Sequence, residues 1–149
     1  MSPRLLDLSY RLDIVYSAIG WPYLFETPMA RKILVVEDNP DNMKLGTWIL
    51  EDEHYEVTGV HSGEECLAQV QKDHYDAVLM DISLPGMDGK EVTRRLRAMD
   101  QFRQLPIIAL TAHAIKGEDD DIRASGVTDL ITKPLDEDIL LARLRHFIG

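Results

Sequence analysis

Four short apolar runs each stop at side chains that could do chemistry together. The clearest run, Val78 to Ile82, carries a single aspartate, Asp81, and Pro85-Gly86 turns the chain soon afterwards. Such runs are typical of strands buried in α/β proteins, whose parallel strands end at the edge of the sheet where ligands bind. The runs 32–36, 105–110 and 127–132 are followed by Glu37 and Asp38, by Thr111 and by Lys133. Three acids, a hydroxyl and an ammonium are therefore expected at one place.

The three acids predict a metal site. Carboxylates held close together repel one another unless a cation is present. A ligand set made only of oxygens, with open positions, suits Mg²⁺, which keeps several waters and shares its shell with a phosphate. We expect Asp38 and Asp81 to bind Mg²⁺ directly and Glu37 to bind it through water. The backbone carbonyl of Ser83, two residues past Asp81, is the expected third protein ligand.

This arrangement suits phosphoryl transfer to a carboxylate. Asp81 could attack a phosphoryl group in line, while the cation and Lys133 stabilise charge on the equatorial oxygens and Thr111 lies within reach. The product would be an acyl phosphate on Asp81. An aspartyl phosphatase would use the same nucleophile, but it needs an acid two residues later to protonate the leaving group, and Ser83 stands there. That alternative is therefore disfavoured.

The elements that position these residues alternate along residues 31–149. Helix and strand patterns repeat five times, which predicts a parallel five-stranded sheet with helices on both faces. The expected architecture is a three-layer α/β/α sandwich of the flavodoxin type, (βα)5, with strand order 2-1-3-4-5. Strands are expected at 32–36, 55–60, 75–81, 106–110 and 127–131, and helices at 41–53, 63–73, 88–99, 114–125 and 136–147.

Composition narrows the class of protein. The chain has 149 residues and a net charge of −10, which argues against binding to a nucleic-acid backbone. The sequence has no run of 18 apolar residues, so it predicts no membrane-spanning helix. The single cysteine, Cys66, excludes an internal disulfide, fits a reducing compartment and is expected to pack inertly in a helix, so we expect a cytoplasmic protein. The cluster Arg94, Arg95 and Arg97 is expected on a solvated helix face, with a partner site as the alternative.

Residues 1–28 do not belong to the repeat. Ser2-Pro3 would begin a helix and Gly20 would end it. Between them an apolar seam recurs at alternating steps of three and four residues: Leu5, Leu8, Leu12, Val15 and Ile19. We predict an amphipathic N-terminal helix that docks on the domain or forms a homodimer with a second copy through residues 4–19. A mis-chosen start codon, with Met29 as the natural beginning, is the alternative.

Residues 31–149 resemble the receiver domain of two-component response regulators, in the CheY-like superfamily. The resemblance rests on four segments in order: Ile33 to Asn39, Met80 to Gly89, Leu110-Thr111-Ala112 and Lys133-Pro134. It implies that Asp81 accepts a phosphoryl group from a phosphohistidine on a sensor histidine kinase or a histidine phosphotransfer protein. It also implies that Thr111 and Lys133 bind phosphoryl oxygens, and that the peptide bond before Pro134 is cis.

Subfamily signals point in two directions. Glu37 to Leu45 is similar to single-domain cell-cycle receivers of the DivK kind, whereas Leu110 to Gly117 is similar to receivers of hybrid histidine kinases. Many receivers carry an aromatic switch residue three positions before the lysine, and here that position is Leu130. Ser83 and His113 flank the path of attacking water in the family. They either tune the lifetime of the acyl phosphate or are plain surface residues.

The leading hypothesis is a phosphorylation-switched binding module with no output domain. It would act on an unidentified output protein through the face formed by helix 114–125, strand 127–131 and helix 136–147. The alternatives are a phosphate shuttle or sink, or a detached receiver of a hybrid histidine kinase. In each case the chain is not an enzyme in its own right, because it would catalyse only its own phosphorylation and dephosphorylation.

Overall fold

The computed structural model describes residues 29–112 and 116–149. The predicted N-terminal helix and His113 lie outside these residues. The elements follow one another in this order: β1 (Lys32–Val36), α2 (Pro40–Asp52), β2 (Glu56–Val60), α3 (Gly63–Lys72), β3 (Ala77–Asp81), α4 (Gly89–Arg97), a 3-10 turn (Asp100–Phe102), β4 (Ile107–Thr111), α5 (Lys116–Ala124), β5 (Asp129–Thr132) and α6 (Glu137–Ile148).

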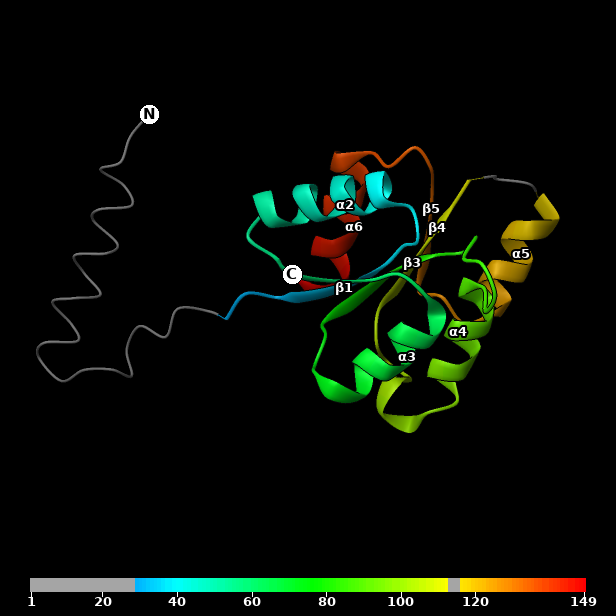
Figure 1. Ribbon diagram of the computed structural model, residues 1–149. Coiled ribbons are helices and arrows are strands. Elements are labelled where there is room, and N and C mark those ends of the chain that lie inside the picture. The colour runs from blue at the N-terminus through cyan, green and yellow to red at the C-terminus, as the bar shows by residue number, and fades with distance from the viewer. Residues whose placement is uncertain (1–28, 113–115) are drawn as a thin grey trace, which may run out of the picture.

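The sheet has the predicted topology. All its strand pairs are parallel and the order is β2-β1-β3-β4-β5, which puts β3 in the centre. Helices α2 and α6 cover one face of the sheet, and α3, α4 and α5 cover the other (Figure 1). The three-layer sandwich expected from the sequence is therefore confirmed.

Alternation along the strands builds a core on each face. Ile33 and Val35 of β1 pack with α2 and α6, whereas Leu34 and Val36 pack with α3 and α4. Successive strand residues point to opposite faces, so a strand covered on both sides must be apolar throughout. Cys66 is fully buried in the second core, where burial raises the pKa of its thiol to about 12. It packs as predicted and carries no thiolate at neutral pH.

Polar side chains fix where the helices begin. Ser62 and Asp136 accept hydrogen bonds from the backbone N–H groups of Glu65 and Ile139, at 3.1 and 3.0 Å, and thereby cap α3 and α6.

The structure corrects the expectation that all three arginines of α4 lie on a solvated helix face. Arg94 and Arg95 are exposed and paired with Glu91, but Arg97 is half-buried, because its guanidinium donates to the carbonyls of Phe102 (2.6 Å) and Gly126 (2.8 Å).

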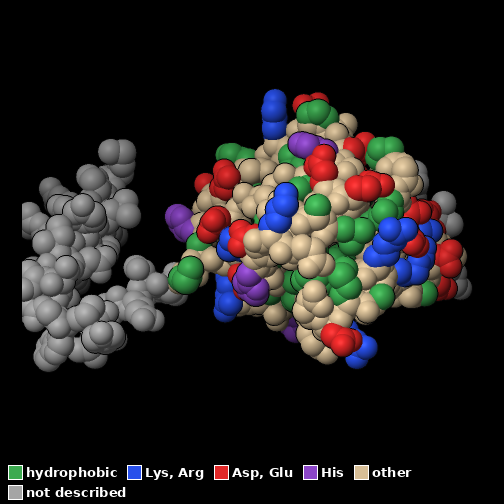
Figure 2. Space-filling view, turned by 60° about the horizontal axis from the view of Figure 1, so that its bottom comes forward, with side chains coloured by type: hydrophobic (Ala, Val, Ile, Leu, Met, Phe, Trp, Pro, Cys, Tyr) green, Lys and Arg blue, Asp and Glu red, His purple; other side chains and the backbone are tan. Residues whose placement is uncertain are grey.

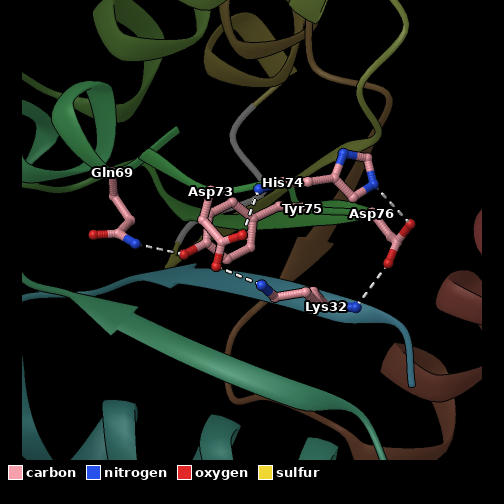
Figure 3. Close-up of polar contacts among 6 residues, drawn as sticks. All are labelled: Lys32, Gln69, Asp73, His74, Tyr75 and Asp76. Carbon is pink, nitrogen blue, oxygen red and sulfur yellow. Dashed lines mark hydrogen bonds and ion pairs between the residues drawn. The ribbon is translucent and has the colours of Figure 1, made fainter. Parts of the chain in front are cut away.

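A polar cluster fastens the beginning of β1 at the amino end of the sheet (Figure 3). The backbone N–H of Lys32 donates to Asp76 at 2.7 Å, and its ammonium is paired with Asp73. Gln69 donates to the Tyr75 hydroxyl at 2.7 Å, and His74 lies 3.3 Å from Asp76. These contacts set the point at which the chain enters the domain.

The surface carries mixed charge. On the face shown in Figure 2, Lys and Arg side chains lie among acidic ones. Within the described parts of the chain, every helix is too short or too polar to cross a membrane.

Candidate functional site

The carboxyl ends of the strands bring the predicted site residues together. Asp81 is the last residue of β3, Thr111 is the last residue of β4, and Glu37 directly follows β1. The Lys133 N–H donates to the Thr111 carbonyl at 2.7 Å, which brings the end of β5 to the same edge. The sequence placed Thr111 one residue past its strand, whereas the structure includes it in β4, where it is buried.

The three acids form one cluster. Glu37, Asp38 and Asp81 each offer a carboxylate oxygen within 4.8 Å of the others. Glu37 and Asp81 are buried and Asp38 is exposed. The Oε2 atom of Glu37 is buried without a hydrogen-bond partner among the described residues. A buried oxygen that lacks a donor, next to two further carboxylates, fits a divalent cation bound by oxygen ligands.

Lys133 supplies the positive charge that the cluster has without a metal. Its ammonium lies 3.4 Å from Glu37 Oε1 and 3.4 Å from Asp81 Oδ1. Even so, burial and then the neighbouring Asp81 carboxylate raise the pKa of Glu37 to about 7, against smaller opposing effects from Asn42 and Lys133. One ammonium therefore does not compensate for crowding the acids together, and a second cation would be attracted to the cluster.

Two loops orient these acids. The side chain of Asn39 accepts the N–H groups of Asp41 (2.9 Å) and Asn42 (3.1 Å) and caps α2, which turns the chain directly after Asp38. On the other side, the Ser83 N–H donates to Asp81 Oδ1 at 3.0 Å and fixes the rotation of that carboxylate. The role of the Ser83 carbonyl as a metal ligand stays a prediction.

Gly89 is a positioning residue that sequence reasoning missed. It begins α4, donates to the Ile82 carbonyl at 3.1 Å, and packs directly on the end of β3. A Cβ atom at position 89 would lie 2.4 Å from the Asp81 carbonyl oxygen and 2.9 Å from Ile82 Cα. Only glycine lets the helix come this close. The sequence placed residues 88 and 89 at the start of the predicted helix 88–99, and Asp88 could have been recognised there as its cap.

The remaining predicted residues surround this centre. The Lys133-Pro134 peptide bond is cis. Leu130, in the position of the family's aromatic switch, is half-buried against the cluster of Ile82, Ala109 and Ile122 beneath α5. A cavity of about 100 Å³ lies between α2 and the segment after β5. Its lining includes Glu37, Asn42, Leu45, Lys133 and Leu135.

Comparison with known proteins decides the family. The family model of the response regulator receiver domain matches residues 33–145. The chain belongs to this family. It is similar to the polar-differentiation response regulator DivK of Brucella ovis, with 37% identity over 121 residues, which cover 81% of this chain and 98% of DivK. It is also similar to the sensor protein GacS of Pseudomonas syringae pv. syringae, with 41% identity over 126 residues.

The likeness to GacS covers only a part of that protein. The match spans 83% of this receiver chain but 14% of GacS. Among solved structures, the receiver domain of a sensor histidine kinase from Pseudomonas aeruginosa PAO1 is 38% identical, with a TM-score of 0.76 over 80% of this chain and 98% of that one. That structure has a magnesium ion coordinated in its active-site cleft. The membership of the receiver-domain family and the CheY-like fold, both predicted from the sequence, are thus confirmed.

Proposed function

We propose that this receiver accepts a phosphoryl group on Asp81 and thereby switches its binding to a partner protein. The domain would comprise residues 31–149, with residues 1–28 as an extension. The observation that carries the proposal is the joint position of the Asp81 carboxylate, the two further acids within 4.8 Å and the Lys133 ammonium at 3.4 Å. The proposed phosphodonor is a sensor histidine kinase or a histidine phosphotransfer protein, and we propose the cytoplasm, where such donors act, as the compartment.

In the proposed reaction, an oxygen of Asp81 attacks the phosphorus in line as the bond from phosphorus to the donor nitrogen breaks. Glu37, Asp38, Asp81 and the Ser83 carbonyl would hold Mg²⁺, which neutralises charge on the phosphoryl oxygens. Lys133, already 3.4 Å from Asp81, would bind one of these oxygens and Thr111 another. Catalysis is therefore positioning plus electrostatic stabilisation, and the domain acts on no other substrate.

The proposed route outward begins at Thr111. Its carbonyl accepts from Lys133, so a shift of Thr111 toward a phosphoryl oxygen pulls on the end of β5. Leu130 of β5 then repacks against Ile82 and Ile122, which transmits the shift to α5. The face formed by α5, β5 and α6 would present the change to the output protein.

A test of phosphorylation uses a small donor. Wild-type protein incubated with acetyl phosphate should be labelled in Mg²⁺ and not in EDTA, and Asp81→Asn should not be labelled. Asp100→Asn is the matched control, because this acid is exposed on the 3-10 turn and pairs with Arg103. Equal labelling of wild type and Asp81→Asn would refute the proposal.

The similarity to the sensor protein GacS favours a second candidate function, in which this receiver passes its phosphoryl group on to another histidine. The lifetime of the acyl phosphate separates the two functions. A switch must persist long enough to bind its partner, whereas a shuttle loses the group rapidly to an added phosphotransfer protein. Labelled protein that is stable alone but discharged within the mixing time by a phosphotransfer domain would favour the shuttle.

A further inference from the structure

Helix α2 exposes an apolar stripe. Trp48 is 61% exposed and Leu45 is 43% exposed, and the two lie one turn apart on the same side of the helix. Asp41 and Asp52, both exposed, continue this stripe at its two ends. The exposed stripe of α2 (Asp41, Leu45, Trp48 and Asp52) is thus apolar in the middle with an acid at each end, and the exposed Lys44 borders it beside Trp48. An exposed tryptophan beside a leucine is typical of a surface that another segment covers.

The extension carries a matching stripe. If residues 4–19 form the predicted helix, Leu5, Leu8, Leu12, Val15 and Ile19 share one side of it. By the same periodicity Arg4 and Arg11 border one edge of that side with Asp7 beside both, while Asp13 lies on the far side. The apolar stripe of the extension therefore has two basic residues along one edge, which could pair with the acids at the ends of the stripe on α2.

The chain enters the domain at the right place for this contact. The Glu56 N–H donates to the Arg31 carbonyl at 2.9 Å, and Tyr55 donates to Leu50 of α2 at 3.1 Å, so residue 31 lies near the C-terminal end of α2. Lys32 is held there by Asp73 and Asp76 (Figure 3). Residues 20–28 could span up to about 30 Å when extended, and the 13 residues of α2 are about 20 Å long.

From these observations we propose that residues 4–19 fold back as an amphipathic helix onto the exposed stripe of α2 and cover Leu45 and Trp48 of the same chain. Leu45 also lines the cavity beside Glu37 and Lys133. A protein that approaches the phosphorylation site along α2 must then displace the extension, whereas a small phosphodonor need not. The extension would act as an intramolecular competitor for this side of the domain.

Trp48 reports the contact directly. The chain has two tryptophans, so Trp21→Phe in the full chain leaves Trp48 as the only one. In this background, Leu12→Asp places a charge in the middle of the apolar stripe of the extension. Ser17→Asp is the matched control, because it adds the same charge on the opposite side of the predicted helix. The measurement is acrylamide quenching of Trp48 fluorescence at several protein concentrations, with the oligomeric state checked by sedimentation.

We expect the quenching constant of Trp48 to be roughly half as large in the parent and Ser17→Asp proteins as in Leu12→Asp, because a packed helix shields one side of the indole. This difference should be independent of protein concentration, and all three proteins should sediment as monomers. Equal quenching in the three proteins would overturn the proposal. Protection that appears only as concentration rises would also overturn it, since a second copy would then be the occupant.

Discussion

Replacing Asp81 by Asn should stabilise the metal-free protein, although it removes the central residue of the site. The acids offer ligand atoms within 4.8 Å of one another, and at that upper limit two unit charges repel by about 3.5 kcal/mol for an effective dielectric constant of about 20. Asp81 has two such neighbours, Glu37 and Asp38. It is attracted by Lys133 at 3.4 Å, which corresponds to about 5 kcal/mol on the same scale.

The repulsions therefore outweigh the attraction by about 2 kcal/mol, and Asp81→Asn should raise the free energy of unfolding by up to this amount. Two contacts of the site are preserved in the variant. The new amide oxygen can still accept the N–H of Ser83, and Lys133 keeps Glu37 as its partner at 3.4 Å. The two donors that Asp81 now satisfies, the Ser83 N–H and the Lys133 ammonium, therefore each keep a partner.

Urea unfolding, followed by circular dichroism at a pH above the Glu37 pKa, measures this difference. In EDTA the variant should be the more stable protein. Binding of Mg²⁺ at one hundred times its dissociation constant adds about 2.7 kcal/mol to the wild type. The variant gains less because one ligand has become an amide, so the order of the two proteins should reverse in Mg²⁺.

Asp129→Asn is the control, because it replaces a buried acid that lies outside the acidic cluster. Asp129 is buried at the opposite end of the sheet and is paired with Arg143. Its replacement should destabilise the protein equally in EDTA and in Mg²⁺. If Asp81→Asn were less stable than wild type in EDTA, or if Mg²⁺ stabilised both proteins equally, the electrostatic reasoning would be wrong.

Three further predictions follow from single contacts. In EDTA, stability should fall as pH rises from about 4.5 to about 7, because Glu37 keeps its proton in the folded state over this window and loses it in the unfolded state; pH-dependent urea unfolding tests this, and Glu37→Gln should abolish the slope. Arg97→Ala should lower the free energy of unfolding by about 3 kcal/mol, since it removes charged donors from two carbonyls; a loss no larger than that of Arg94→Ala, its exposed neighbour, would contradict this. His54→Gly should raise the melting temperature, with a gain of about 0.5–1 kcal/mol, because His54 has φ of 68°; unchanged melting would mean that this backbone is unstrained.

Much of the site was predictable because short segments of the sequence mark where each buried strand ends. An apolar run followed by a polar residue marks the end of a buried strand, and parallel strands put such ends together. Asp81, Glu37 and Thr111 therefore converge as the sequence predicted. Lys133 was expected at the same edge for this reason too, although the run before it, 127–132, is a weaker strand pattern.

Contacts between a side chain and a backbone atom far away in the sequence could not be predicted. Arg97 was expected on a solvated face because it stands beside Arg94 and Arg95, but one of its two partner carbonyls, that of Gly126, lies 29 residues away. A carbonyl is present in every residue, so it leaves no mark in the sequence pattern. For the same reason, periodicity identified α2 as a helix without showing that Leu45 and Trp48 would stay exposed.

The close packing of Gly89 against the end of β3 also has a consequence for genetics. A saturation screen for loss of signalling should return position 89 together with Asp81, although the two are eight positions apart and residue 89 does no chemistry. A Cβ atom there would lie 2.4 Å from the Asp81 carbonyl oxygen, so any side chain must push away the strand end that aims the carboxylate. Alleles at Gly89 should therefore resemble alleles at Asp81, and second-site suppressors should fall in the segment 82–88, whose rearrangement would make room for the new side chain.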